Sequence, residues 1–132
     1  MNTFPTWGDE YTVGNQLLDE QHKRLLEISG GASKLLSAPR VAAADFQDLL
    51  NDFVETLREH FDTEERALAS NGYPNLAKQA AEHDAFRLTL ANLVRDADNG
   101  QLHKIVLLVL IADYADRHLY TDMLCKDYLK PH

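Results

Sequence analysis

Histidine and carboxylate side chains recur at positions where a helical bundle would place its core. Four histidines each fall within a separate apolar helical pattern: His22, His60, His83 and His118. Glu64 follows His60 by four residues, and Asp122 follows His118 by the same interval, so each pair lies on one helix face. A buried histidine costs free energy unless its ring nitrogens find partners, and a metal ion is one such partner. The spacing therefore predicts a metal site inside a four-helix bundle.

The residue types narrow the choice of metal. Imidazole nitrogens together with carboxylate oxygens suit iron, manganese or zinc. Cys125 is the only cysteine, which argues against a site built from several thiolates and excludes an internal disulfide. Four histidines are too few ligands for two ions, so we expect Glu64 and Asp122 to be ligands as well, and each could bridge two ions.

Four periodic segments must position these side chains, and turn signals separate them. Pro39 follows the first segment, Asn71-Gly72-Tyr73-Pro74 the second, and Asp98-Asn99-Gly100 the third. Apolar residues recur in steps of three and four, as they do along bundle seams. In the second segment this inward pattern comprises Phe46, Leu50, Phe53, Leu57, His60, Glu64 and Ala67. We therefore predict an all-α, up-and-down four-helix bundle.

Counting residues from the turns places all four histidines near one end of this bundle, because neighbouring helices with short loops run antiparallel. Residues 1–15, with Pro5, Gly8 and Gly14, predict an irregular N-terminal arm that Trp7 and Tyr11 attach to the bundle. In the fourth segment the inward pattern runs through Leu108, Ile111, Ala115, His118 and Asp122. We expect residues 1–132 to form a single domain.

Composition limits the classes of partner. Lys plus Arg number 13 and Asp plus Glu number 21, so the formal net charge is −8, and no nucleic acid or anionic membrane is expected as a partner. The longest strongly apolar run, residues 105–112, is far shorter than the roughly 20 residues that span a bilayer. The N-terminal residues lack the regions of a signal peptide. These features together predict a cytoplasmic protein.

Several short motifs occur in a characteristic order along nearly the whole chain. They are Trp7 in the arm, LLDEQH ending at His22, HFDTEE from His60, GYP at 72–74, AEHDAF around His83 and DYADRHL around His118. With these motifs the chain resembles the single-domain bacterial hemerythrins, a family of non-haem di-iron proteins that bind dioxygen. The His-Phe-x-x-Glu-Glu and Tyr-Pro pieces, in that order, are the most specific.

The resemblance implies two iron ions bridged by an oxo or hydroxo group, one glutamate and one aspartate. His22 and His60 would hold the iron whose open position takes dioxygen. His83 and His118 would hold the other iron, with Glu64 as a bridge. The dioxygen pocket would be lined by Leu25, Phe61, Ala115 and Leu119.

Three positions depart from the family pattern. The family carries two histidines four residues apart on its third helix, and here Gln79 takes the place of the first; its carbonyl oxygen is a poorer ligand than imidazole. The family places its last carboxylate five residues after the histidine, whereas Asp122 lies four after His118. With a slight shift of the helix, Asp122 could still bridge the two ions or serve as a terminal ligand of one of them. Ala115 replaces a usual leucine over the pocket, and its smaller side chain would admit water or larger ligands.

Three functions remain compatible with these residues. The first is reversible dioxygen binding for storage, delivery or sensing. We then expect an oxygen-binding protein more than an enzyme. The second is an iron-dependent peroxidase or oxidase, or a nitric-oxide or redox responder, in which Gln79 leaves an additional open position. The third is a bundle that has lost one or both irons and acts as a binding or structural module. The sequence identifies no protein partner.

Overall fold

The computed structural model describes residues 7–130, and helices make up its regular structure. The three longest are α1 (Gln16–Leu36), α2 (Ala43–Ser70) and α3 (Leu76–Asp98). A fourth helical segment joins α4 (Lys104–Asp113), the π-helical turn η2 (Tyr114–His118) and α5 (Leu119–Leu124). The 3-10 helices η1 (Asp9–Tyr11) and η3 (Lys126–Tyr128) flank the bundle. Residues 7–130 contain no strand, so the predicted all-α class is confirmed.

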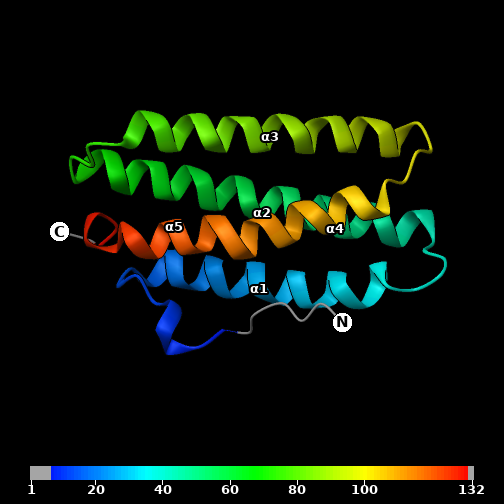
Figure 1. Cartoon of the computed structure of the whole chain (residues 1–132), viewed down its shortest axis with the longest axis horizontal. Coiled ribbons are helices and arrows are strands. Elements are labelled where there is room, and N and C mark those ends of the chain that lie inside the picture. The colour runs from blue at the N-terminus through cyan, green and yellow to red at the C-terminus, as the bar shows by residue number, and fades with distance from the viewer. Residues whose placement is uncertain (1–6, 131–132) are drawn as a thin grey trace.

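The four helical segments lie side by side along the long axis of the molecule (Figure 1). Short loops join successive segments at alternate ends, so that sequence neighbours run antiparallel. Helix α1 packs against α2 and α4, and α2 packs against α3. This arrangement is the predicted up-and-down four-helix bundle, and it brings residues from all four segments to a shared interior.

Local sequence signals set the helix ends. The Asn15 side chain caps α1 by accepting a hydrogen bond from the backbone N–H three residues later, at 3.2 Å. Gly72 and Gly100 follow α2 and α3 with φ of +68° and +84°, a conformation that favours glycine. After Gly72 the Tyr73 N–H donates to the Leu68 carbonyl at 3.0 Å, the six-residue closure of a Schellman motif. The predicted breaks after the second and third segments are therefore real helix ends.

The fourth segment differs locally from an ideal helix. The π-helical turn places one extra residue in a turn, and such bulges are frequent at functional sites. Both Tyr114 and Ala115 are buried here. Upstream of the turn the fully buried residues are Leu107 and the predicted Ile111, whereas the predicted Leu108 is half-buried. The turn ends at His118, so it rotates the helix immediately before the candidate ligands.

Part of the predicted N-terminal arm is visible. Trp7 and Tyr11 pack against a small buried cluster of Leu26, Ala115 and Leu119, as the sequence led us to expect. Residues 1–6 of the arm lie outside the described residues. The arm therefore covers the α1 and α5 side of the bundle at the level of the histidines.

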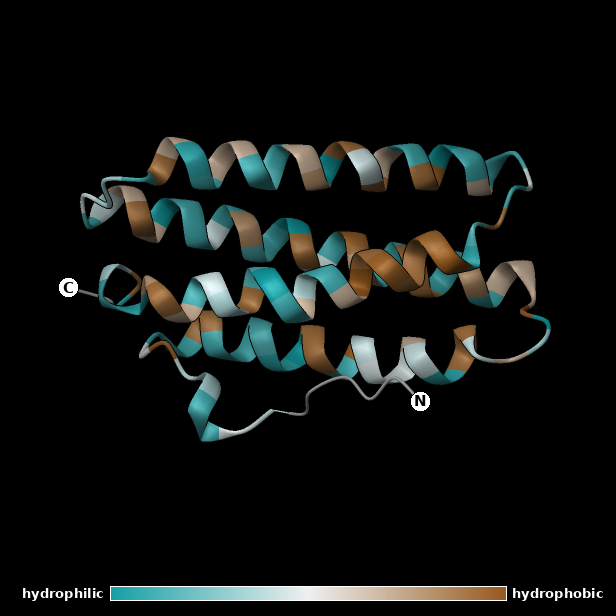
Figure 2. Ribbon diagram, in the orientation of Figure 1, coloured by the Kyte–Doolittle hydropathy of each residue, from teal (hydrophilic) through white to brown (hydrophobic). Residues whose placement is uncertain are grey.

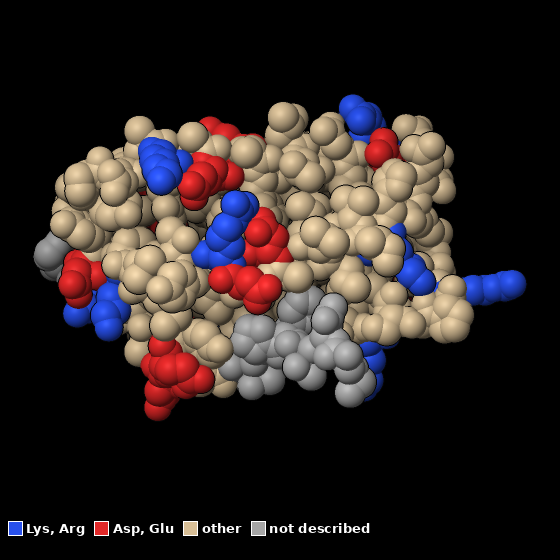
Figure 3. All heavy atoms as spheres, viewed as in Figure 1, with Lys and Arg blue, Asp and Glu red and all other residues tan. Residues whose placement is uncertain are grey.

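The surface carries scattered charges. Basic and acidic side chains are interspersed on the face shown in Figure 3. The α4 ribbon is mostly hydrophobic, as its brown colour in Figure 2 shows, and Ile105, Val106 and Val109 are exposed on it. No helix among residues 7–130 is both long enough and apolar enough to cross a bilayer.

Candidate metal centre

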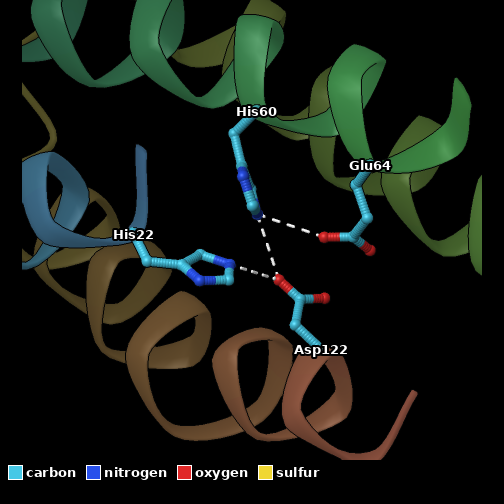
Figure 4. A group of neighbouring side chains, drawn as sticks. All are labelled: His22, His60, Glu64 and Asp122. Carbon is cyan, nitrogen blue, oxygen red and sulfur yellow. Dashed lines mark hydrogen bonds and ion pairs between the residues drawn. The ribbon is translucent and has the colours of Figure 1, made fainter. Parts of the chain in front are cut away.

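Four candidate ligands converge in the bundle interior. His22 comes from α1, His60 and Glu64 from α2, and Asp122 from α5, and their side chains point toward one another (Figure 4). One ligand atom from each of the four lies within 4.8 Å of the others. None of the four residues is more than 1% exposed. Three helical segments thus supply a closed set of two imidazoles and two carboxylates.

Short polar contacts hold this set together. Asp122 Oδ2 lies 2.9 Å from His22 Nε2 and 3.0 Å from His60 Nε2. Glu64 Oε2 lies 3.1 Å from the same His60 nitrogen. Two acidic groups therefore face two imidazole nitrogens without intervening protein atoms, which is the donor set that iron, manganese and zinc share.

The other two predicted histidines have longer contacts with carboxylates through their Nε2 atoms. His83 Nε2 is 3.4 Å from Glu64 Oε1 and makes no hydrogen bond. His118 Nε2 also has no hydrogen-bond partner, and an ion-pair contact joins it to Asp113 Oδ2 at 3.9 Å. The ring centroids of His83 and His118 are 6.2 Å apart, against 4.5 Å for His22 and His60. This side has the same ligand types in a more open arrangement.

Gln79 is buried beside this second pair. Its amide nitrogen donates a hydrogen bond to Glu64 Oε1 at 2.7 Å. In this arrangement Gln79 acts as a hydrogen-bond donor to a candidate ligand. The substitution for histidine thus leaves the second side with two imidazoles and one shared carboxylate.

Unpartnered buried atoms give an independent test of whether these residues fit a metal. Buried polar atoms are nearly always hydrogen-bonded in native proteins. Among residues 7–130, five buried side-chain atoms have no hydrogen-bond partner, and four of them belong to predicted ligands: His22 Nδ1, Glu64 Oε2, His83 Nε2 and His118 Nε2. The residues present fit a metal group, because a cation would give the unpartnered Glu64 Oε2, His83 Nε2 and His118 Nε2 a partner.

Neighbouring side chains orient two of the histidines. Gln21 Oε1 accepts a hydrogen bond from His60 Nδ1 at 3.1 Å, which turns Nε2 toward the centre. Glu65 Oε2 accepts from His83 Nδ1 at 2.9 Å and also from Arg87 Nη2 at 2.7 Å. Sequence reasoning did not identify these supporting groups, although Gln21 and Glu65 each adjoin a predicted ligand and so border the seam.

Charge interactions shift the pKa values of the ligands in opposite directions. Burial would lower the pKa of His60, but hydrogen bonds and charge interactions with Asp122 and Glu64 overcome this and raise it to about 9. Both His60 ring nitrogens face acceptors, as protonation requires. Burial lowers the pKa of His118, which keeps this imidazole neutral. Burial would raise the pKa of Glu64, but His60 and His83 lower it well below its usual value.

The residues predicted to line a dioxygen pocket fall into two groups. Leu25 and Phe61 belong to the main core, and the Phe61 ring stacks on His83 with centroids 3.8 Å apart. Ala115 and Leu119 instead pack in the small cluster beneath the arm. Leu25 and Phe61 therefore share the main core, whereas Ala115 and Leu119 belong to a separate cluster.

Tyr114 is a neighbour of the site that sequence reasoning missed. Its ring lies 6.2 Å from that of His60 in a perpendicular arrangement and 6.4 Å from that of His118 in a parallel one. Tyr114 precedes His118 by four residues, so its place one turn away on the same face was the available signal. The predicted pattern passed through Ala115 instead, because the π-helical turn brings both residues inward.

Two clefts approach the centre from different directions. An apolar cleft of about 300 Å³ lies between α2 and α3 and reaches Phe61, with Leu57 and Leu90 in its wall. A polar cleft of about 160 Å³ reaches Gln79, with Lys78 and Glu82 in its wall. The two clefts thus differ in polarity, and each ends at a neighbour of the candidate ligands.

Comparison with known proteins agrees with this geometry. A family model described as the hemerythrin HHE cation binding domain matches residues 13–126. The bacteriohemerythrin of Clostridium acetobutylicum is 36% identical over 61% of this chain and 64% of its own length. That of Campylobacter jejuni is 29% identical over 81% of this chain and 80% of its own length.

A third relative, the bacteriohemerythrin of Stenotrophomonas maltophilia, is 26% identical over 61% of this chain and 51% of its own length. The chain thus spans less than two thirds of the Clostridium and Stenotrophomonas relatives that it matches. No solved structure gives a significant match. Because the family model covers most of the chain and the candidate ligands, the chain belongs to the hemerythrin HHE cation binding domain family.

Proposed function

We propose that this protein binds dioxygen reversibly at a non-haem centre of two iron ions, for storage, delivery or sensing. The observation that carries the proposal is the convergence of His22, His60, Glu64 and Asp122 in a buried cluster, in a chain of the hemerythrin family. When bound, the two irons supply the electrons that dioxygen takes up. The protein's part is to hold the metals, orient the imidazoles and exclude water.

Glu64 is the best candidate for a bridge between the two ions. Its Oε2 lies 3.1 Å from His60 Nε2, and its Oε1 lies 3.4 Å from His83 Nε2. Each carboxylate oxygen therefore contacts a histidine on a different side of the centre. His22, His60 and Asp122 would complete the ligands of one ion. His83 and His118 would serve the other, and Gln79 would stabilise the bridging carboxylate through its hydrogen bond.

Burial and access both favour a dioxygen ligand. The ligands are almost fully buried, and Leu25 and Phe61 form apolar walls, which limits the water that would promote loss of electrons from the metals. The apolar cleft that ends at Phe61 offers a route for an apolar diatomic molecule. An uncharged gas enters such a route without the desolvation cost that an ion would meet.

The proposal is tested by reconstituting the protein with ferrous iron under anaerobic conditions. We expect close to two irons per chain and an oxygenated absorption spectrum that forms in air and reverses on deoxygenation. His60→Ala removes a central ligand and should abolish this spectrum. His103→Ala changes an exposed histidine that pairs with Asp96, and it should leave the spectrum intact. An unchanged oxygenated spectrum in His60→Ala would refute the assignment.

A second candidate function follows from the polar cleft at Gln79. A coordination position left open by the missing histidine, reached by a polar route, suits peroxide turnover or a nitric-oxide or redox response. The loaded protein would then consume peroxide faster than the same concentration of free iron. Gln79→His should suppress that reaction by filling the position, and equal rates for both proteins would exclude this role for Gln79.

A further inference from the structure

Tyr114 carries a polar atom that metal binding does not explain. Of the five unpartnered buried side-chain atoms among residues 7–130, its hydroxyl is the one outside the predicted ligands. The side chain is fully buried in the main core cluster. A buried hydroxyl without a hydrogen bond destabilises the fold, because it has lost its interactions with water.

Packing alone gives no reason for a tyrosine at this position. The surrounding core consists of aliphatic and phenylalanine side chains, and Phe53 contacts the Tyr114 ring edge to face with centroids 6.4 Å apart. A phenylalanine would bury the same ring without desolvating a hydroxyl. The hydroxyl therefore needs a partner that the protein itself does not provide.

The position of the ring indicates where that partner lies. Tyr114 is perpendicular to the His60 ring and parallel to the His118 ring, so it stands beside one histidine from each side of the centre. The Tyr114 ring is thus held in the same buried layer as the rings of two candidate ligands.

The hydroxyl can only be a useful donor if it keeps its proton. Burial raises the pKa of Tyr114 well above its usual value of 10, and the negative charges of Asp122 and Glu64 raise it further. A phenol that keeps its proton can donate a hydrogen bond.

We infer that Tyr114 donates a hydrogen bond to a small ligand bound at the metal centre, and that this ligand is an anion or an electron-rich diatomic molecule. The inference rests on the proposed function in that the ligand occupies the metal-loaded site. Tyr114 would then help to set which small molecules bind and how fast they leave. A donor at this place favours ligands that carry negative charge, because hydrogen bonds to charged acceptors are the stronger ones.

The test compares wild-type protein with Tyr114→Phe, which removes only the hydroxyl. Azide is the probe, added to the oxidised, iron-loaded proteins and followed by its absorption and infrared bands. We expect the azide dissociation constant to rise about tenfold in Tyr114→Phe, the loss of one hydrogen bond to a charged acceptor. The infrared stretch of bound azide should shift as well. Tyr128→Phe alters a partly exposed tyrosine that pairs with Tyr73, and it should change neither reading.

A second measurement uses the metal-free proteins. If the hydroxyl has no protein partner, Tyr114→Phe should unfold at the same or a higher urea concentration than wild type. A lower midpoint would show that the hydroxyl already has a partner within the fold and would overturn the inference. Unchanged azide affinity and stretch would also overturn it, and so would iron-loaded wild type that binds no azide. Failure of the proposed function looks different, since it is the absence of a reversible oxygenated spectrum in wild type.

Discussion

His22 and His60 face two carboxylates in a cluster whose ligand atoms lie within 4.8 Å of one another, whereas His83 lies 3.4 Å from Glu64 and His118 lies 3.9 Å from Asp113. The first pair of rings is 4.5 Å apart and the second 6.2 Å. The difference originates in α3, which supplies His83 and a glutamine in place of a second imidazole. Two ions bound to these halves would therefore have unequal affinities.

The halves also differ in how their histidines are supported. His60 donates a hydrogen bond to the neutral amide of Gln21, while His83 donates one to the carboxylate of Glu65. Arg87 also donates a hydrogen bond to Glu65. A carboxylate behind a histidine raises the basicity of the ligand more than an amide does. The half with fewer ligands thus has the stronger support, which partly compensates for the missing imidazole.

The largest effect should come from the residue that both halves share. Glu64→Ala removes a carboxylate that contacts both His60 and His83, so we expect iron per chain to fall from near two to near zero. The measurement is metal analysis after anaerobic reconstitution and removal of unbound iron. Glu59→Ala, an exposed residue on the same helix, is the control and should keep its iron. Retention of one iron by Glu64→Ala would mean that one half is self-sufficient.

The supporting carboxylate should matter to one half alone. Glu65→Gln weakens the partner of His83 without touching the His22 side, and we expect the affinity for the second ion to fall about 10- to 100-fold. Calorimetric titration of the metal-free protein with ferrous or cobaltous ion resolves the two metal-binding steps. Gln21→Ala gives the mirror experiment on His60. An equal loss of metal affinity in both binding steps after Glu65→Gln would argue against two separate halves.

Restoring an imidazole should make the metal affinities of the two halves more similar. In Gln79→His the weaker half gains a ligand, and the second metal should bind about tenfold more tightly, or about 1.4 kcal/mol. Gln79→Leu removes the hydrogen bond to Glu64 without adding a ligand, and it should weaken that step instead. If wild type already binds two ions in a single, equal step, the comparison between the halves fails.

Much of this arrangement could be predicted from residue spacing. The steps of three and four placed His22, His60, Glu64, His83 and Asp122 on the inner faces, and all are buried. Turn signals at Gly72 and Gly100 gave the helix ends correctly. Periodicity reports which face of a helix is inward, and this information is local to each segment.

Residue spacing could not predict the contacts between side chains of different helices. The π-helical turn at Tyr114–His118 depends on tertiary packing, and it changed which residues face inward upstream of the ligands. Likewise, no pattern shows that Gln79 would turn its amide nitrogen toward Glu64, because that choice depends on a residue from another helix. The unequal halves are a property of contacts between helices and therefore appear only in the structure.

The smallest effect is the response of the metal-free protein to pH, in which the raised pKa values of His60 and His83 act in one direction and the lowered pKa of His118 acts in the other. The raised pKa of His60, about 9, means that its contribution to the stability of the metal-free protein is fully present below about pH 6.5 and is lost as the pH rises through 9. The lowered pKa of His118 has the opposite sign, so its contribution is present above about pH 6.5 and is lost as the pH falls. Urea unfolding of the metal-free protein should therefore show falling stability between pH 6.5 and 9, and His60→Gln should flatten this slope. A ring proton of His60 that titrates near pH 6.5 by NMR would contradict the assignment, because Glu64 and Asp122 would then not be holding it.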